Sequence, residues 1–322
     1  MNTFDLTRIR YPFSYRVSPF AEEIFRYTLH WARQQQLIVS ENEKALQWIR
    51  SGTQFAARVY PFSSLDGLCA IACWITLFFR VDDDCDALPR GRKKAYYQGL
   101  VNSTLDIMQH DRIIAPGEGY TYAACFSSLW QRIRQLAHPE WLQWFMQEQE
   151  QQLRACEWEA ANLDNGQAPS VATYLEMRPY FAGAYICICL IYLGFQVRLP
   201  HSVSRHPKVK QLMQLGAGLP CWANDLHSFA KELHDGDVHN LVLLLQREKQ
   251  LTLAAAMEET LQVHEATLRQ FLQLEQQLPS FGAAADAELR RYLHGLKALI
   301  SGNHEWAVSD TRRYTMTASL AT

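Results

Sequence analysis

The sequence predicts an all-α fold in a single helical domain spanning residues 1–322. Apolar residues recur with the 3.6-residue period of an α-helix along most of the chain. No stretch alternates apolar and polar residues as a half-buried strand would. At 322 residues and 48% hydrophobic, the chain can bury a large core. We find no internal repeat or linker that would divide it.

Turn-forming residues separate the predicted helices. The first helix covers residues 19–38 and has one apolar face, and Ser63-Ser64 can cap the helix of about 65–84. The other predicted helices cover 41–51, 92–110, 120–137, 139–162, 170–197, 206–233, 239–248, 251–277 and 283–307. The breaks between them contain Pro89, Gly91, Pro116-Gly117, Asn165-Gly166, Pro169 and Asp235-Gly236-Asp237.

One predicted helix contains Pro179 and Gly183. Pro179 removes a backbone hydrogen bond and should kink the helix, and Gly183 should loosen the next turn. The freed carbonyls of Phe181 and Ala182 could then point into a cavity as partial negative charges. The alternative is a packing kink without a chemical role.

Gly216, Gly218 and Pro220 precede Asn224 in another predicted helix. Pro220 would suit the first turn of a helix that carries Asn224. The glycines predict either a break that orients this helix or close packing against a neighbour, and the sequence leaves both open.

Charge and apolar patterning indicate a cytoplasmic protein. A net charge of −2 argues against a broad surface for nucleic acid or anionic membrane. The eight cysteines form no Cys-x-x-Cys pair, which favours buried thiols in a reducing compartment. The N-terminal residues lack the apolar core of a signal peptide. The longest apolar run, residues 181–195, is shorter than a membrane span of ~18–20 residues, so we expect a buried core helix.

The most informative stretch is residues 224–232. Asn224, Ser228 and Glu232 are spaced at i, i+4 and i+8, so they share one face of a helix. Three oxygen-bearing side chains on one face suit Mg²⁺, which also binds substrate phosphates. Lys231 lies at the edge of this face, and a cation beside a metal site indicates that an anion binds there too.

A second group of oxygen-bearing side chains ends the apolar helix of residues 68–79. It comprises Asp82, Asp83 and Asp86. Like charges at i, i+3 and i, i+4 repel, and carboxylates are unfavourable at a helix C-terminus. A metal site would explain them, and a solvated acidic helix end is the ordinary alternative.

Together these motifs resemble those of microbial class I terpene synthases, also called terpene cyclases. Asp82-Asp83-x-x-Asp86 looks like the family's aspartate-rich motif, and residues 224–232 look like its second metal motif. Arg178, 46 residues before Asn224, is placed like the family's diphosphate-sensing arginine. Arg313-Tyr314, about 80 residues after Glu232, resembles the pair that closes over the diphosphate. The matches run from residue 82 to residue 314.

The resemblance implies a helical bundle around a central cavity that binds three Mg²⁺ ions, with Mn²⁺ as an alternative. Asp82 would hold two ions with help from Asp86, and Asn224, Ser228 and Glu232 would hold the third. Asp83, grouped with these metal-site residues, would pair with Arg313 on closure. Arg178, Lys231, Arg313 and Tyr314 would bind the diphosphate. Many family members have an acidic residue where this chain has Phe181.

The rest of such a site must be apolar, because water quenches a carbocation. The substrate-binding candidates are Phe79, Phe181, Ala182 and Trp306, and further candidates for the wall are Phe55, Trp74 and Phe78. Aromatic faces stabilise cations, although core packing explains each of these residues equally well. Phe79 lies one turn before Asp82, so it shares a face with a site residue.

Other candidates have less support. A nucleophilic triad of Asp225, His227 and Ser228 is disfavoured because neighbouring residues on one helix point in different directions. Asp235-x-Asp237 could bind a metal, but a helix-capping turn is the stronger interpretation. The histidines have no zinc-binding spacing.

We therefore expect Mg²⁺-dependent ionisation and cyclisation of a linear isoprenyl diphosphate. Farnesyl diphosphate (C15), giving a sesquiterpene hydrocarbon or alcohol, is the first choice, geranylgeranyl diphosphate (C20) the second, and C10 a further option. A prenyltransferase would normally carry a second aspartate-rich motif. A non-catalytic helical binding protein is the alternative from another functional class. Homodimers are frequent among relatives, and no nucleic-acid or membrane partner is expected.

Overall fold

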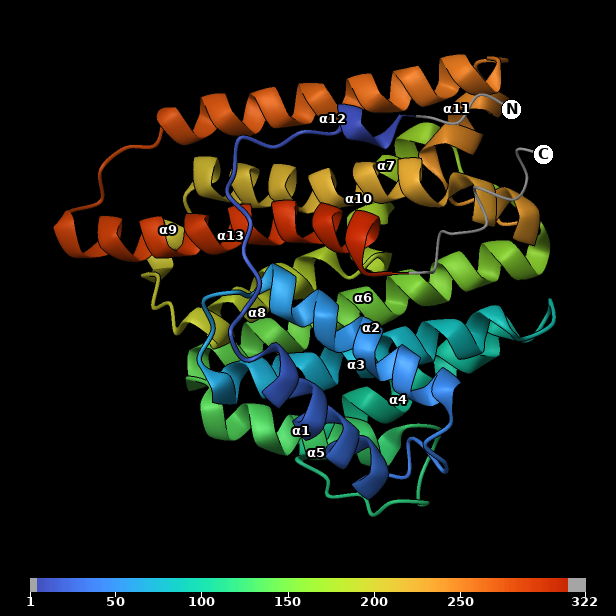
Figure 1. The fold of residues 1–322 in the computed structure, drawn as a ribbon, viewed down its shortest axis with the longest axis vertical. Coiled ribbons are helices and arrows are strands. Elements are labelled where there is room, and N and C mark those ends of the chain that lie inside the picture. Colours follow the sequence, from blue (N-terminus) through green and yellow to red (C-terminus); the bar gives the residue numbers. More distant parts are fainter. Residues whose placement is uncertain (1–4, 312–322) are drawn as a thin grey trace.

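Helices account for all the regular secondary structure in the computed structural model, which describes residues 5–311 (Figure 1). In chain order they are η1 (a 3₁₀ helix, Leu6–Arg8), α1 (Ala21–Gln34), α2 (Glu43–Val59), α3 (Leu65–Asp86), α4 (Lys93–His110), α5 (Ala123–Leu136), α6 (Pro139–Asn165), α7 (Val171–Phe181), α8 (Ala184–Phe195), α9 (His201–Ser204), α10 (Pro207–Asp235), α11 (Leu241–Glu248), α12 (Leu253–Gln276) and α13 (Ala283–Ser309). The predicted all-α fold is confirmed.

Several of the described helices begin at a residue whose side chain caps them. Asn42, Ser64, Ser170 and Thr252 each accept a hydrogen bond from a backbone N–H in the first turn of the following helix. The cap of α3 is therefore Ser64 rather than Ser63. The sequence did not predict η1 or α9, and α2 continues to Val59, beyond the predicted end at residue 51.

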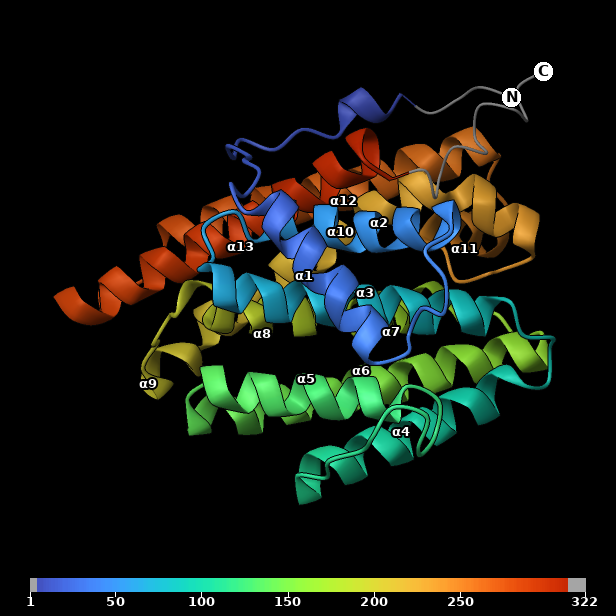
Figure 2. The same cartoon turned by 60° about the horizontal axis from the view of Figure 1, so that its bottom comes forward.

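The helices form layers around α3 and α8. Figure 2 shows α10, α12 and α13 on one side and α4, α5 and α6 on the other. α8 is almost entirely apolar and packs against α3, α6, α7, α10 and α13. Near the N-terminus, Tyr11 reaches α12, where its hydroxyl lies 2.7 Å from His264 Nε2. In this arrangement, sides of α3, α6, α7 and α10 face one another, and a functional site can form between them.

The break between α7 and α8 falls at Gly183, so the predicted kink at Pro179 is misplaced. Pro179 stays inside the last turns of α7, and Gly183 ends the helix because it adopts a φ of +71° that other residues rarely tolerate. The Phe181 carbonyl accepts a hydrogen bond from Cys156 Sγ at 3.5 Å.

α10 runs unbroken through Gly216, Gly218 and Pro220. The predicted break is wrong, and the close-packing alternative is right. A Cβ atom at Gly216 would lie 2.8 Å from Leu296 of α13. Pro220 lies in the middle of this long helix rather than near its first turn, because packing against α12 and α13 outweighs the lost hydrogen bond.

Among the described residues, one segment is long and apolar enough to cross a membrane, judged by length and composition alone. It covers residues 171–195, and 72% of its most apolar 18-residue stretch is buried inside the fold. Burial of this kind agrees with the expected core helix.

Candidate functional site

A cavity lies between the facing sides of α3, α6, α7, α8, α10 and α13. Most of the predicted site residues line it: Phe79, Asp82, Asp86, Arg178, Phe181, Ala182, Asn224, Ser228, Lys231, Glu232 and Trp306. Arg313 and Tyr314 lie outside the described residues. Side chains separated by more than 200 positions thus meet at one place.

The aspartate-rich motif turns only part of its carboxylates toward this cavity. Asp82 and Asp86 line it, as their i, i+4 spacing predicts, whereas Asp83 is exposed and lies outside the lining. Asp84 also points elsewhere: it pairs with Arg80 at 3.0 Å and accepts a hydrogen bond from the Tyr122 hydroxyl. The side chains of Asp83 and Asp84 therefore lie on the side of α3 that faces away from the cavity.

The second motif faces the first across the cavity. Asn224, Ser228 and Glu232 lie on one face of α10, and all three line the cavity. Lys231 Nζ lies 3.7 Å from Asp86 and 3.1 Å from Asp235, so it links the two motifs. Four oxygen-bearing side-chain types (Asp, Asn, Ser and Glu) therefore converge at one end, which is the donor set that Mg²⁺ prefers.

Arg178 is held beside the second motif by a buried ion pair. Its Nε donates to Asp225 Oδ1 at 3.0 Å, and its Nη2 donates to Asn224 Oδ1 at 2.7 Å. Asp225 is fully buried and also accepts from the Tyr174 hydroxyl at 2.9 Å and from the backbone N–H of Leu241 at 3.0 Å. This anchoring role of Asp225 was not predictable from the sequence, because its partners come from α7 and α11.

Burial and neighbouring negative charge raise the pKa of two cavity carboxylates, Asp86 and Glu232. Burial, and then the charge of Asp237, raises the pKa of Glu232 to about 8. Burial, and then the charge of Asp82, raises the pKa of Asp86 to about 6. A cation bound between these groups would oppose both shifts, because its charge favours the ionised carboxylates, so the residues present fit a divalent metal.

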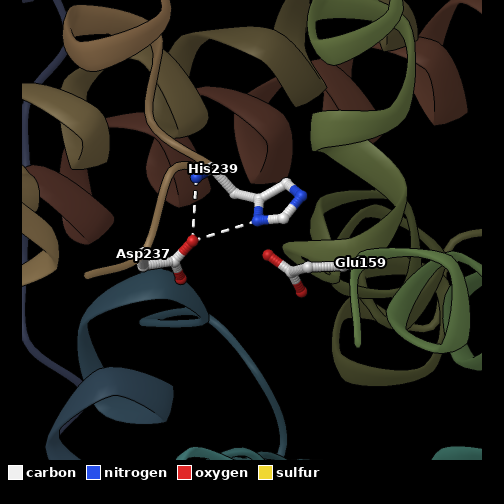
Figure 3. A group of neighbouring side chains, drawn as sticks. All are labelled: Glu159, Asp237 and His239. Carbon is white, nitrogen blue, oxygen red and sulfur yellow. Dashed lines mark hydrogen bonds and ion pairs between the residues drawn. The ribbon is translucent and has the colours of Figure 1, made fainter. Parts of the chain in front are cut away.

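A further polar group, made up of Glu159, Asp237 and His239, also lines the cavity. Figure 3 shows these three side chains pointing toward one another. One oxygen each of Glu159 and Asp237 and a ring nitrogen of His239 lie within 4.8 Å of one another, which is close enough to hold an ion. Asp237 Oδ1 accepts from the backbone N–H of His239 at 2.8 Å, and it lies 3.0 Å from His239 Nδ1. The sequence did not indicate Glu159.

The predicted capping turn at Asp235-x-Asp237 is present. α10 ends at Asp235, and Gly236 caps it with a φ of +72°. The N–H of Asp237 donates to the Glu232 carbonyl at 2.9 Å. The turn brings the Asp237 side chain to the cavity, so a capping role and a place in the site occur together.

Aromatic rings form the opposite, apolar part of the cavity. The ring centroids of Phe55, Phe79 and Trp306 lie 5.1–5.6 Å apart, and Phe78 and Phe181 also contribute to the lining. Trp74 does not line the cavity. It packs between Phe126 and Phe145 in the core, because α5 and α6 cover its face of α3.

Comparisons with known proteins agree with this geometry. Residues 73–270 match the model of the family described as terpene synthase family 2, C-terminal metal binding. A (+)-T-muurolol synthase ((2E,6E)-farnesyl diphosphate cyclizing) from Roseiflexus castenholzii is 33% identical over 305 residues, 95% of this chain and 93% of the relative. A 10-epi-cubebol synthase from Sorangium cellulosum is 29% identical and covers 91% of this chain and 93% of its own.

Solved structures share the fold. A germacradien-4-ol synthase from Streptomyces citricolor superposes with a TM-score of 0.80 at 25% identity, over 92% of this chain and 97% of that one. An α-eudesmol synthase reaches a TM-score of 0.84 at 23% identity, over 94% of this chain and all of the other, and so supports the fold alone.

The buried ion pair leads to a stability prediction. Asp225→Asn leaves the Arg178 guanidinium buried without its counter-ion, so the free energy of unfolding should fall by about 3–5 kcal/mol. Denaturant unfolding of the metal-free protein measures it. Arg8→Ala is the control, because it breaks a solvent-exposed ion pair with Glu258, whose loss should lower the free energy of unfolding far less. Equal losses in the two variants would contradict the prediction.

The raised carboxylate pKa values predict a pH dependence. Between about pH 5 and 8, folded metal-free protein keeps protons that the unfolded chain releases, so the free energy of unfolding should fall as pH rises. Glu232→Gln removes one of the raised carboxylates and should make this fall less steep, measured by denaturant unfolding across that range. Glu258→Gln is the control, since Arg8 lowers the pKa of Glu258. Identical slopes in all three proteins would refute the assignment.

Proposed function

We propose, from the premise that this chain belongs to the microbial class I terpene synthases, that it ionises and cyclises farnesyl diphosphate to a sesquiterpene and diphosphate. The observation that carries the proposal is the convergence of Asp82 and Asp86 from α3 with Asn224, Ser228 and Glu232 from α10 at one end of an aromatic-walled cavity.

The polar end of the cavity fits divalent metal ions and a diphosphate. The family uses a divalent metal, and we propose three Mg²⁺ ions, held by Asp82 and Asp86 on one side and by Asn224, Ser228 and Glu232 on the other. When bound, the ions neutralise the negative charge that develops on the departing diphosphate. Asp83 is proposed to act from outside the cavity, as a partner for Arg313.

Two cationic side chains lie where the leaving group would bind. Arg178 offers a planar guanidinium whose N–H groups suit bidentate contact with phosphate oxygens. Lys231 adds an ammonium group between the two motifs. We propose that both bind the diphosphate and that Arg313 and Tyr314 complete the set. The C–O bond then breaks with its electron pair on the diphosphate oxygen, and a hydrocarbon cation remains.

The apolar part of the cavity can hold that cation. The faces of Phe79, Phe181 and Trp306 would each stabilise it by about 1–2 kcal/mol when water is excluded. Ala182, at the break before α8, leaves room for the chain to fold beside them. Loss of a proton from the cyclised cation, or addition of water followed by loss of a proton from the resulting oxonium ion, then gives a neutral product.

The cysteines indicate the cellular compartment in which the enzyme would work. All eight cysteines are free thiols and seven are buried, which agrees with a soluble protein in a reducing cytoplasm. We propose that the chain works as one helical domain and that it can form a homodimer.

The metal ligands can be tested directly. Asn224→Ala and Glu232→Ala should each abolish turnover, because an incomplete ligand set leaves the leaving-group charge uncompensated, while circular dichroism stays helical. His234→Ala is the matched control on α10, since its side chain is exposed and lies outside the cavity lining. Full activity in both ligand variants would rule out this site.

The substrate is tested by incubating the protein with Mg²⁺ and each of the C10, C15, C20 and C25 isoprenyl diphosphates. Extraction and mass spectrometry should show cyclic C15 products as the main turnover. Exclusive turnover of the C20 substrate would identify a diterpene synthase. No turnover, with no thermal shift on adding Mg²⁺ and pyrophosphate together, would indicate a non-catalytic protein.

A further inference from the structure

The last turn of α3 carries the carboxylates of the first motif at an unfavourable place. A helix C-terminus has a negative dipole end and unpaired carbonyl groups. Here the same turn also bears Asp82 and Asp86, which face the cavity. Repulsion among these negative groups would unwind or rotate the turn unless another part of the protein held it.

Lys93 stabilises the last turn of α3 through hydrogen bonds. It is the first residue of α4, and its side chain is buried, with the residue 8% exposed. Lysine is rarely buried without a partner. Its Nζ donates to the carbonyl of Cys85 at 2.6 Å and to that of Asp86 at 2.9 Å. The ammonium group therefore satisfies two terminal carbonyls of α3 and places a positive charge at the negative end of the helix.

Asp164, near the end of α6, fixes the segment that presents Lys93. Its carboxylate accepts hydrogen bonds from the backbone N–H groups of Gly91 at 2.6 Å and Lys94 at 2.9 Å. α6 also lines the cavity through Glu159 and Leu163. The end of α3 is thus tied through α4 to a second wall of the cavity.

We propose that Lys93 is a positioning residue for the first metal motif. By binding the carbonyls of Cys85 and Asp86, it keeps the last turn of α3 wound, with Asp82 and Asp86 facing the ligands on α10. The inference rests on the proposed function, because it takes Asp82 and Asp86 to be ligands of divalent ions. Lys93 itself lies outside the cavity lining and acts through those two residues.

Lys93→Met tests the proposal, since it keeps the apolar stem and removes the charge and the donors. In the metal-free protein, amide hydrogen exchange at residues 82–88 should become roughly tenfold faster, because the last turn opens more often. The Mg²⁺ concentration that half-saturates the thermal shift with pyrophosphate should rise roughly tenfold, as when a residue that orients a metal ligand is lost. The Mg²⁺ dependence of turnover should shift in parallel, with KM for the diphosphate at saturating Mg²⁺ little changed.

Lys208→Met is the matched control. Lys208 Nζ donates to the Gln277 carbonyl at 2.8 Å, which caps the end of α12, and neither residue lines the cavity. This variant should leave exchange at residues 82–88 and the Mg²⁺ dependence at wild-type values. Lys93→Arg retains a cation with donors and should recover most of the wild-type Mg²⁺ dependence.

Asp164→Asn keeps the proposal testable if Lys93→Met folds poorly. It weakens the support of the loop and should shift both readouts in the same direction by a smaller factor. The proposal is overturned if the variants lower the melting temperature but leave exchange at residues 82–88 and the half-saturating Mg²⁺ concentration unchanged. If the wild-type protein turns over no diphosphate, the proposed function fails. The exchange comparison between Lys93→Met and Lys208→Met then decides the positioning role by itself.

Discussion

Repulsion between carboxylates gathered in one small space is the constraint on which the rest of the site depends. Asp86 from α3, Glu232 from α10 and Asp237 from the turn after it meet at one end of the cavity. Burial and neighbouring charge raise the pKa of Asp86 to about 6 and that of Glu232 to about 8, so the folded protein holds these groups together against their tendency to separate or to bind protons. Stability and metal affinity are therefore linked: the repulsion that destabilises the metal-free site is what favours a bound cation.

Arg178 and Asp225 form the opposite kind of interaction, an attraction between unlike charges inside the protein. Their charges compensate each other in the core, and the pair holds the guanidinium beside Asn224. Asp225 does not depend on Arg178 alone, because the Tyr174 hydroxyl and the N–H of Leu241 also donate to it. A guanidinium that turned from Asn224 toward an anion in the cavity would thus leave behind a carboxylate with two neutral donors. These two donors partly offset the desolvation of Asp225, although burial still raises the pKa of its carboxyl group.

The sequence predicted the helices and the facing motifs because both depend on local spacing. Apolar periodicity decides which face of a helix is buried, and i, i+4 spacing puts motif residues on one face. The predictions that were wrong concern residues whose structure depends on contacts with residues distant in sequence. Pro179 and Pro220 remain helical because neighbouring helices support them, and Trp74 turns away from the cavity because α5 and α6 cover it. Asp225 and Glu159 were missed for the same reason, since nothing in the residues beside them reveals their partners.

α3 joins the two halves of the cavity on one rigid element. Phe79 precedes Asp82 by about one turn, so an aromatic face and a metal-site carboxylate lie roughly 5 Å apart along the same helix. In the proposed reaction, the spacing between the metal-bound diphosphate and the Phe79 ring is then set by helix pitch rather than by a loop. Phe55 and Trp306 complete the aromatic wall from α2 and α13, and among residues 5–311 these two helices carry none of the proposed metal ligands. Changes on α2 or α13 would therefore reshape the apolar chamber without moving the proposed ligands, whereas a change in the winding of α3 would disturb both parts of the proposed site together.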